Sequence, residues 1–257
     1  MLSSFDGVPY NDLVILEQAY RTYSIKEEKK GKYLLTSIEE FIGGYRGQLV
    51  KDYVDHYQFV SVYPKNDDDS TDSIDPEKSG GGKWYYDTGT SLPCQPLYSN
   101  NNLLVVVSAG DIIIEDDSYT SGIVGHAALV EGKFYSAQYG TYYVRLIEAI
   151  LPGVKRSVID GTRYSEKNSR VYRVPSAGVS DKSSAVSFSA SQLNKPWFFT
   201  SSHYSGSKPT WYCSELVWAS YYNTGIDLVP GLSYDLPLLP AALENSSLIN
   251  SVTVSTF

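Results

Sequence analysis

The most reactive side chain in the sequence is the thiol of Cys213. It stands at the start of residues 213–224 (CSELVWASYYNT), whose spacing predicts an amphipathic helix that stops before Gly225. A thiol at a helix N-terminus lies at the positive end of the helix dipole, which lowers its pKa and enlarges the reactive thiolate fraction. The alternative is a small buried hydrophobic residue, the commonest role of an isolated cysteine.

Two further ionisable residues lie in segments that we expect to be β-strands. His126 lies within 123–130 (IVGHAALV) and Glu148 within 142–150 (YYVRLIEAI), and in both segments the neighbours two residues away are apolar. A carboxylate or an imidazole on an apolar face needs a partner, so adjacent strands would let the two residues satisfy each other. Taken singly, a satisfied core histidine and a solvent-facing glutamate at a strand end explain them as well.

Together the three residues supply a nucleophile, a base and an orienting carboxylate. The imidazole of His126 would take the thiol proton of Cys213, and Glu148 would fix the imidazole tautomer and stabilise its charged form. Tyr212, directly before the nucleophile, is a candidate to help the backbone N–H of Cys213 bind an oxyanion, although an aromatic residue there is more often packing. A serine mechanism is weaker because no G-x-S-x-G motif occurs.

The rest of the composition excludes several other kinds of chemistry. The second cysteine, Cys94, lies in a loop-like S-L-P-C-Q-P context, and we expect it to be neither catalytic nor bonded to Cys213. No H-E-x-x-H or C-x-x-C motif occurs, so we expect no metal and no other cofactor. The net charge of -8 argues against nucleic-acid binding. No run of 18 apolar residues exists, which predicts no transmembrane segment.

The sequence divides into three parts by composition. Residues 1–63 are expected to form a helical N-terminal extension, because apolar residues follow helical spacing there. Residues 64–83 (PKNDDDSTDSIDPEKSGGGK) predict an acidic, Gly-rich linker or loop; a calcium loop is the alternative, but the D-x-D-x-D-G spacing is missing. Residues 84–257 should form an α+β catalytic domain.

Within this third part, short apolar runs predict strands and longer periodic segments predict helices. The expected strands are 103–107, 112–114, 123–130, 142–150 and 169–174, and the expected helices are 184–193 and 213–224.

Five segments occur in a characteristic order: GDIII (110–114), GHAALV (125–130), IEAILPGV (147–154), YRV (172–174) and YCSELVWASYYNTGIDL (212–228). They resemble the circularly permuted NlpC-like papain-fold cysteine peptidases and amidases, the YiiX/YaeF-like group. In ordinary papain-type enzymes the cysteine helix precedes the histidine strand, whereas here the histidine strand comes first. The resemblance covers about 84–240 and implies a permuted papain-like fold, a small antiparallel sheet packed against helices.

Carried over residue by residue, the catalytic positions of this group fall on Cys213, His126 and Glu148. The stretch from 131 to 143 is longer than usual in the group, so Ser136 and Gln138 are the alternative orienters.

The resemblance implies a cysteine hydrolase that cleaves an amide bond through an acyl-enzyme, with a peptide, cell-wall stem peptide or acyl-amide as substrate. The alternative is a thiol-dependent acyltransferase or lipid esterase on the same fold. A non-catalytic binding module is a third possibility, against which the intact cysteine, histidine and glutamate argue. The extension and linker indicate a secreted or cell-surface bacterial protein, with a cytoplasmic location as the alternative, since no signal peptide is visible at Met1.

Overall fold

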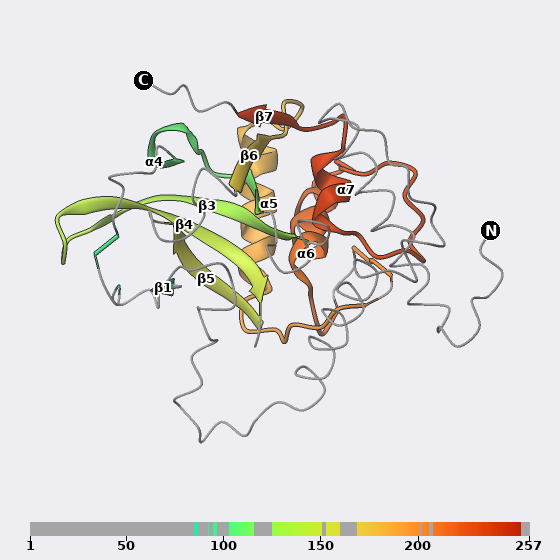
Figure 1. Ribbon diagram of the computed structural model, residues 1–257, viewed down its shortest axis with the longest axis horizontal. Coiled ribbons are helices and arrows are strands. Elements are labelled where there is room, and N and C mark those ends of the chain that lie inside the picture. The colour runs from blue at the N-terminus through green and yellow to red at the C-terminus, as the bar shows by residue number, and fades with distance from the viewer. Residues whose placement is uncertain are drawn as a thin grey trace, which may run out of the picture.

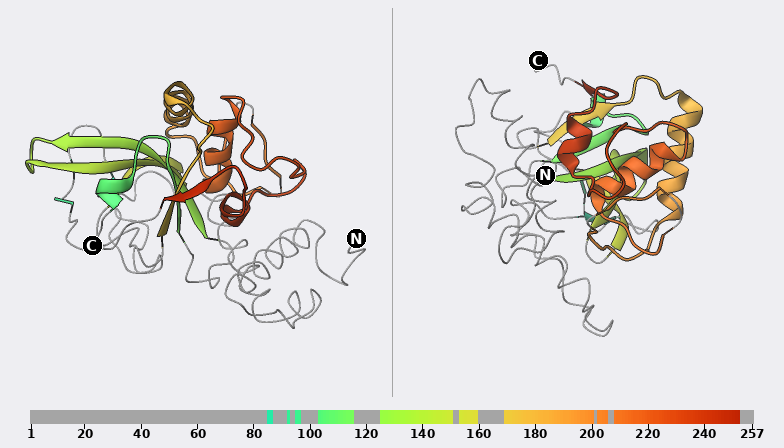
Figure 2. Two further views of the ribbon diagram at one scale, coloured as in Figure 1. Left: turned by 90° about the horizontal axis from the view of Figure 1, so that it is seen from above. Right: turned by 90° about the vertical axis from the view of Figure 1, so that its right-hand side faces the viewer.

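The structure is a computed structural model, and it describes residues 85–86, 92, 95–96, 103–115, 125–150, 153–159, 169–200, 202–205 and 208–252. The predicted helical extension (1–63), the predicted linker (64–83) and Cys94 lie outside these residues. The described part is a seven-stranded antiparallel sheet with its larger helices gathered on one side (Figures 1 and 2).

The sheet has the strand order β1-β5-β4-β3-β2-β6-β7, so β3, β4 and β5 form consecutive hairpins at its centre. Its strands are β1 (Tyr85–Tyr86), β2 (Ile112–Glu115), β3 (His126–Ser136), β4 (Thr141–Ile150), β5 (Gly153–Ile159), β6 (Ser169–Arg173) and β7 (Asn250–Val252). Four strands predicted from apolar runs, at 112–114, 123–130, 142–150 and 169–174, are present as β2, β3, β4 and β6, although β3 begins and ends later than its run.

Four helices complete the described elements: α4 (Leu103–Val106), α5 (Val179–Ser191), α6 (Cys213–Tyr222) and α7 (Pro240–Glu244). The helices predicted at 184–193 and 213–224 correspond to α5 and α6, and α6 starts at the predicted nucleophile.

The strand predicted at 103–107 is wrong, because this run forms α4. Leu103 and Val107 are buried in one apolar cluster, whereas Val105 between them is 76% exposed. A strand would have put all three side chains on one face, but a helical turn buries the first and the fifth and leaves the third in solvent.

The two faces of the sheet belong to two different apolar clusters. Residues such as Ala127 and Leu129 of β3 pack with Leu216 of α6 and with α5, and this is the larger cluster. Their neighbours Ala128 and Val130 project to the other face, where they meet Val107 and the side chains of β2 and β4 that point the same way. This alternation follows from the two-residue period of a strand.

The β3–β4 hairpin is long because the stretch from 131 to 143 continues both strands. The register shifts between Val130 and Gly132, which marks a β-bulge at Glu131. The Glu131 carboxylate accepts hydrogen bonds from Arg145 of β4 at 2.6 Å and from Arg156 of β5 at 2.9 Å. These contacts tie the bulge to the two neighbouring strands. Among the described helices, none is long and apolar enough to cross a membrane.

Candidate active site

His126 and Glu148 are in direct contact. His126 is the first residue of β3, and its Nε2 lies 2.7 Å from Oε2 of Glu148 on the adjacent strand β4. The glutamate is completely buried, whereas the imidazole keeps 17% of its surface exposed. The other carboxylate oxygen of Glu148, Oε1, accepts a hydrogen bond from the hydroxyl of Ser157 on β5.

The ends of the strands explain why a third side chain can approach this pair. The β3–β4 ladder has its last pair at Leu129 and Ile147, while β3 remains paired with β2 as far as His126. Helix α6 packs against β3. Its first residue approaches His126 and Ala127 at the point where β3 begins.

Cys213 is that residue. Its half-buried, free thiol lies close enough to the imidazole of His126 and the backbone N–H of Ala127 for both groups to lower the pKa of the thiol. Because Nε2 of His126 faces Glu148, the nitrogen left for the thiol is Nδ1. The structure thus brings the predicted nucleophile, base and orienter together, although they are far apart in the sequence.

The electrostatics of the pair favour a charged thiolate and a charged imidazole. Burial raises the pKa of the Cys213 thiol, but the charge of His126 and the hydrogen bonds from His126 and Ala127 outweigh burial and lower it. Burial likewise opposes the charged form of His126, yet the Cys213 thiolate and the hydrogen bonds with Cys213 and Glu148 raise the pKa of His126 to about 10. A thiolate is the nucleophilic form of cysteine, so this arrangement is suited to nucleophilic catalysis.

The alternative orienters Ser136 and Gln138 lie elsewhere. Ser136 is the last residue of β3 and pairs with Thr141 next to the hairpin turn, at the opposite end of the strand from His126. At about 3.3 Å per residue, this end is roughly 30 Å from His126. Gln138 is exposed in the turn itself. Glu148 is therefore the orienter that the geometry supports.

Tyr212 has contacts that differ from the sequence-based expectation. Its side chain is buried, and its hydroxyl donates to the backbone carbonyl of Ser202 at 3.2 Å and accepts from the backbone N–H of Leu238 at 2.9 Å. These bonds tie the loop before α6 to the segment before α7. The hydroxyl thus has a structural role, and the backbone N–H of Cys213 at the start of α6 remains the candidate oxyanion donor.

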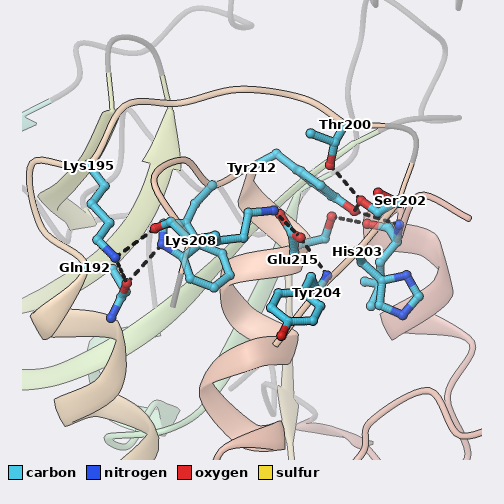
Figure 3. Close-up of polar contacts among 12 residues, drawn as sticks. Gln192, Lys195, Thr200, Ser202, His203, Tyr204, Lys208, Tyr212 and Glu215 are labelled. Carbon is cyan, nitrogen blue, oxygen red and sulfur yellow. Dashed lines mark hydrogen bonds and ion pairs between the residues drawn. The ribbon is translucent and has the colours of Figure 1, made fainter. Parts of the chain in front are cut away.

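Hydrogen bonds connect the two ends of the loop that leads from α5 to Cys213 (Figure 3). The ammonium group of Lys195 donates to the side chain of Gln192 at 2.7 Å and to the backbone carbonyl of Lys208 at 2.8 Å. Trp197 and Trp211 form an isolated parallel β-bridge between the two ends of the loop. These contacts fix the chain immediately before the nucleophile.

Glu215, two residues after Cys213, holds the same loop from the helix side. It is completely buried, and its Oε1 accepts from the backbone N–H of Tyr204 at 2.9 Å and from the ammonium group of Lys208 (Figure 3). Burial raises the pKa of Glu215 to about 7, although Lys208 and the N–H of Tyr204 act in the opposite direction. One buried carboxylate therefore connects the first turn of α6 to two points of the loop.

Sequence reasoning did not identify Ser157 or Glu215. The segment that forms β5 was not recognised as a strand, so nothing indicated that Ser157 would lie beside Glu148. Glu215 did carry a signal, because an acidic residue three positions after the helix N-cap is typical of a helix start. Within the described residues, no group of three or more His, Cys, Asp or Glu side chains is arranged to hold a metal ion.

Papain-like cysteine hydrolases have this arrangement: a cysteine at the N-terminus of a helix lies beside a histidine that is carried by an antiparallel sheet. Comparison with known families gives the same class: residues 109–230 match the family described as permuted papain-like amidase enzyme, YaeF/YiiX, C92 family. The match includes His126, Glu148 and Cys213, and it confirms the resemblance to the YiiX/YaeF-like group. The match to this family of amidases supports the general assignment of the chain as a cysteine amide hydrolase.

Comparison with solved structures gives a crystal structure of the metalloprotein yiiX from Escherichia coli O157:H7. The alignment has 21% identity and a TM-score of 0.41, and it covers 58% of this chain and 97% of that chain. None of the curated proteins compared with this chain matches it.

Proposed function

We propose that this chain is a cysteine amidase or peptidase in which Cys213 is the nucleophile, His126 the acid–base and Glu148 the orienter. The observation that carries the proposal is that His126 interacts with both other residues, through Nε2 with Glu148 at 2.7 Å and electrostatically with the thiol of Cys213. The lowered pKa of Cys213 and the raised pKa of His126 support the same roles.

In the first half of the proposed reaction, the Cys213 thiolate attacks the carbonyl carbon of the amide and forms a C–S bond. The negative charge moves to the carbonyl oxygen, which the backbone N–H of Cys213 can stabilise. The imidazolium of His126 then gives its proton to the amide nitrogen as the C–N bond breaks. The amine leaves, and a thioester with Cys213 remains.

In the second half, the neutral imidazole of His126 takes a proton from water, and the water oxygen attacks the thioester carbon. The C–S bond breaks, the acid is released, and the thiolate and imidazolium are restored. Throughout both halves, Glu148 holds Nε2 of His126 and stabilises its charge, so that the opposite nitrogen stays directed at the thiol.

We propose peptides, cell-wall stem peptides above all, as the substrate class. The family description as amidases supports an amide substrate. A substrate in the cell wall would require a secreted or cell-surface location, which we propose with it.

Mass spectrometry of products from a panel of cell-wall stem peptides tests the proposal, together with acid quenching of the reaction to trap the thioester. We expect the mass of the whole protein to rise by that of the acyl group. Cys213→Ala should abolish cleavage, and His126→Ala should lower the rate by roughly 10²–10⁴-fold. Glu148→Gln should cost less, because an amide can still orient the imidazole but cannot stabilise its charge.

Cys94→Ala is the matched control, since it removes the other of the two cysteines. It should leave cleavage unchanged. Cleavage that survives Cys213→Ala, or that is lost in Cys94→Ala, would overturn the assignment of the nucleophile.

A further inference from the structure

The carboxylate of Glu148 accepts a hydrogen bond from a hydroxyl group through the oxygen that does not face the imidazole. Ser157 of β5 is completely buried, and its Oγ donates to Oε1 of Glu148, while Oε2 faces His126. With one oxygen bound to β5 and the other to the imidazole, the plane of the carboxylate is fixed at both ends.

The β4–β5 register accounts for this contact. Ser157 pairs with Leu146, so its side chain projects to the same face as Leu146 and Glu148. The residue directly opposite Glu148 is Lys155, but its ammonium group is directed to Oδ1 of Asn194, at 3.4 Å. In this contact Glu148 therefore receives its support from a neutral hydroxyl, which does not compete with the imidazolium of His126 as a second cation would.

We infer that Ser157 is a positioning residue of the active site, which acts on His126 and Cys213 through Glu148. This inference rests on the proposed function. Without the hydroxyl, Glu148 would lose a hydrogen bond to its charged form, and its carboxylate would be held less firmly in the orientation that faces His126. The imidazolium would then be less well stabilised, and the Cys213 thiolate with it.

The thiol reaction with iodoacetamide, followed by whole-protein mass as a function of pH, measures this effect without a substrate. In a Cys94→Ala background, Cys213 is the only thiol. We expect Ser157→Ala to move the acid limb of the alkylation profile to higher pH by about one unit. At pH 10, which lies above the expected acid limb of both proteins, the thiolate is formed in both and the rate should be unchanged.

Two further comparisons separate positioning from general damage. Ser220→Ala removes an equally buried hydroxyl, bonded to the carbonyl of Leu216 within α6, and should leave the profile unchanged. In a Glu148→Gln background, Ser157→Ala should add a much smaller shift, because the charge through which it acts is gone. If Ser157→Ala does not fold, Ser157→Thr can be compared with Ser157→Val, because the two side chains have the same shape and only Thr has a hydroxyl. The acid limb should then move to higher pH in Ser157→Val and not in Ser157→Thr.

The outcomes distinguish this inference from the proposed function. A parent profile with the acid limb of an ordinary thiol, near pH 8.5, would contradict the thiolate–imidazolium pair itself. Suppose instead that the acid limb of the parent lies well below that value. Identical profiles for the parent and Ser157→Ala, or for Ser157→Thr and Ser157→Val, would then overturn only the role of Ser157. A full shift in the Glu148→Gln background would also overturn it.

Discussion

At the scale of single residues, the charge of the site depends on which partners each group has. Glu148 is completely buried and is hydrogen-bonded to a hydroxyl and to the imidazole of His126, so its charge acts directly on His126. The raised pKa of His126 keeps its imidazole protonated, and this positive charge beside Cys213 lowers the pKa of the thiol. A pair of this kind is active above the lowered pKa of the thiol and below the pKa of about 10 of the imidazole.

These residues differ in how far the sequence could predict them. Cys213 and His126 were identifiable because a helix start and an apolar strand face are patterns along the chain. The hydrogen bonds of the Tyr212 hydroxyl were not predictable. Its partners Ser202 and Leu238 lie in two loops, and no local sequence pattern specifies the course of these loops. The support that Ser157 gives to Glu148 depends likewise on a strand register.

Tyr212→Phe separates a structural from a catalytic hydroxyl. The substitution leaves the buried N–H of Leu238 without its acceptor, so we expect a loss of about 1–3 kcal/mol in the free energy of unfolding. Turnover per folded molecule should be unchanged. Denaturant unfolding and steady-state kinetics measure the two effects, with Tyr142→Phe, at an exposed position, as the control. A loss of turnover of roughly 100-fold at unchanged stability would instead assign the hydroxyl to the oxyanion.

At the scale of elements, four strands of the sheet and the two long helices were predictable, whereas α4 and β5 were not, and nor were the short elements β1, α7 and β7. The run at 103–107 is apolar throughout, so its composition does not distinguish a strand from a helical turn, and only the burial of Leu103 and Val107 settles the matter. In β5 the charged pair Lys155 and Arg156 interrupts the apolar run, which hides the strand. Arg156 is accommodated because Glu131 on the β3 bulge binds it.

The free energy of unfolding should depend on pH through Glu215, which connects the first turn of α6 to the loop before it. Its pKa is raised to about 7 in the folded protein, against about 4.3 in an unfolded chain. The folded state therefore holds this proton to higher pH, and the associated stability is present below about pH 4.3 and is lost as pH rises through about 7. Glu215→Gln does not titrate and should lack this loss.

Denaturant unfolding at several pH values checks this prediction. Between about pH 4.3 and 7, the stability of the native chain should fall relative to Glu215→Gln, by on the order of 3 kcal/mol in total. Asp235→Asn, which changes an exposed carboxylate, should run parallel to the native chain. A difference between the native chain and Glu215→Gln that stays constant across this range would show that Glu215 ionises in the folded protein as it does in the unfolded one.

At the scale of the whole molecule, the described elements form one sheet with its helices, and the proposed site lies where α6 meets the start of β3. The family match from 109 to 230 spans β2 through α6. It includes the strands that carry His126 and Glu148 and the helix that begins with Cys213. The three side chains to which we assign the chemistry therefore all lie in described elements after residue 84.

The division of the chain at residues 64–83 is the remaining prediction at this scale. If this segment is a linker, brief trypsin treatment of the full chain should cut first at Lys65, Lys78 or Lys83 and leave a fragment that contains residues 84–257. Because β1 already pairs with β5 at Tyr85, we expect this fragment to stay folded and to keep the iodoacetamide reactivity of Cys213. Mass spectrometry of the time course identifies the cuts. First cuts within β3–β5, or a fragment whose thiol reacts like a free cysteine, would mean that residues 1–63 belong to the catalytic unit.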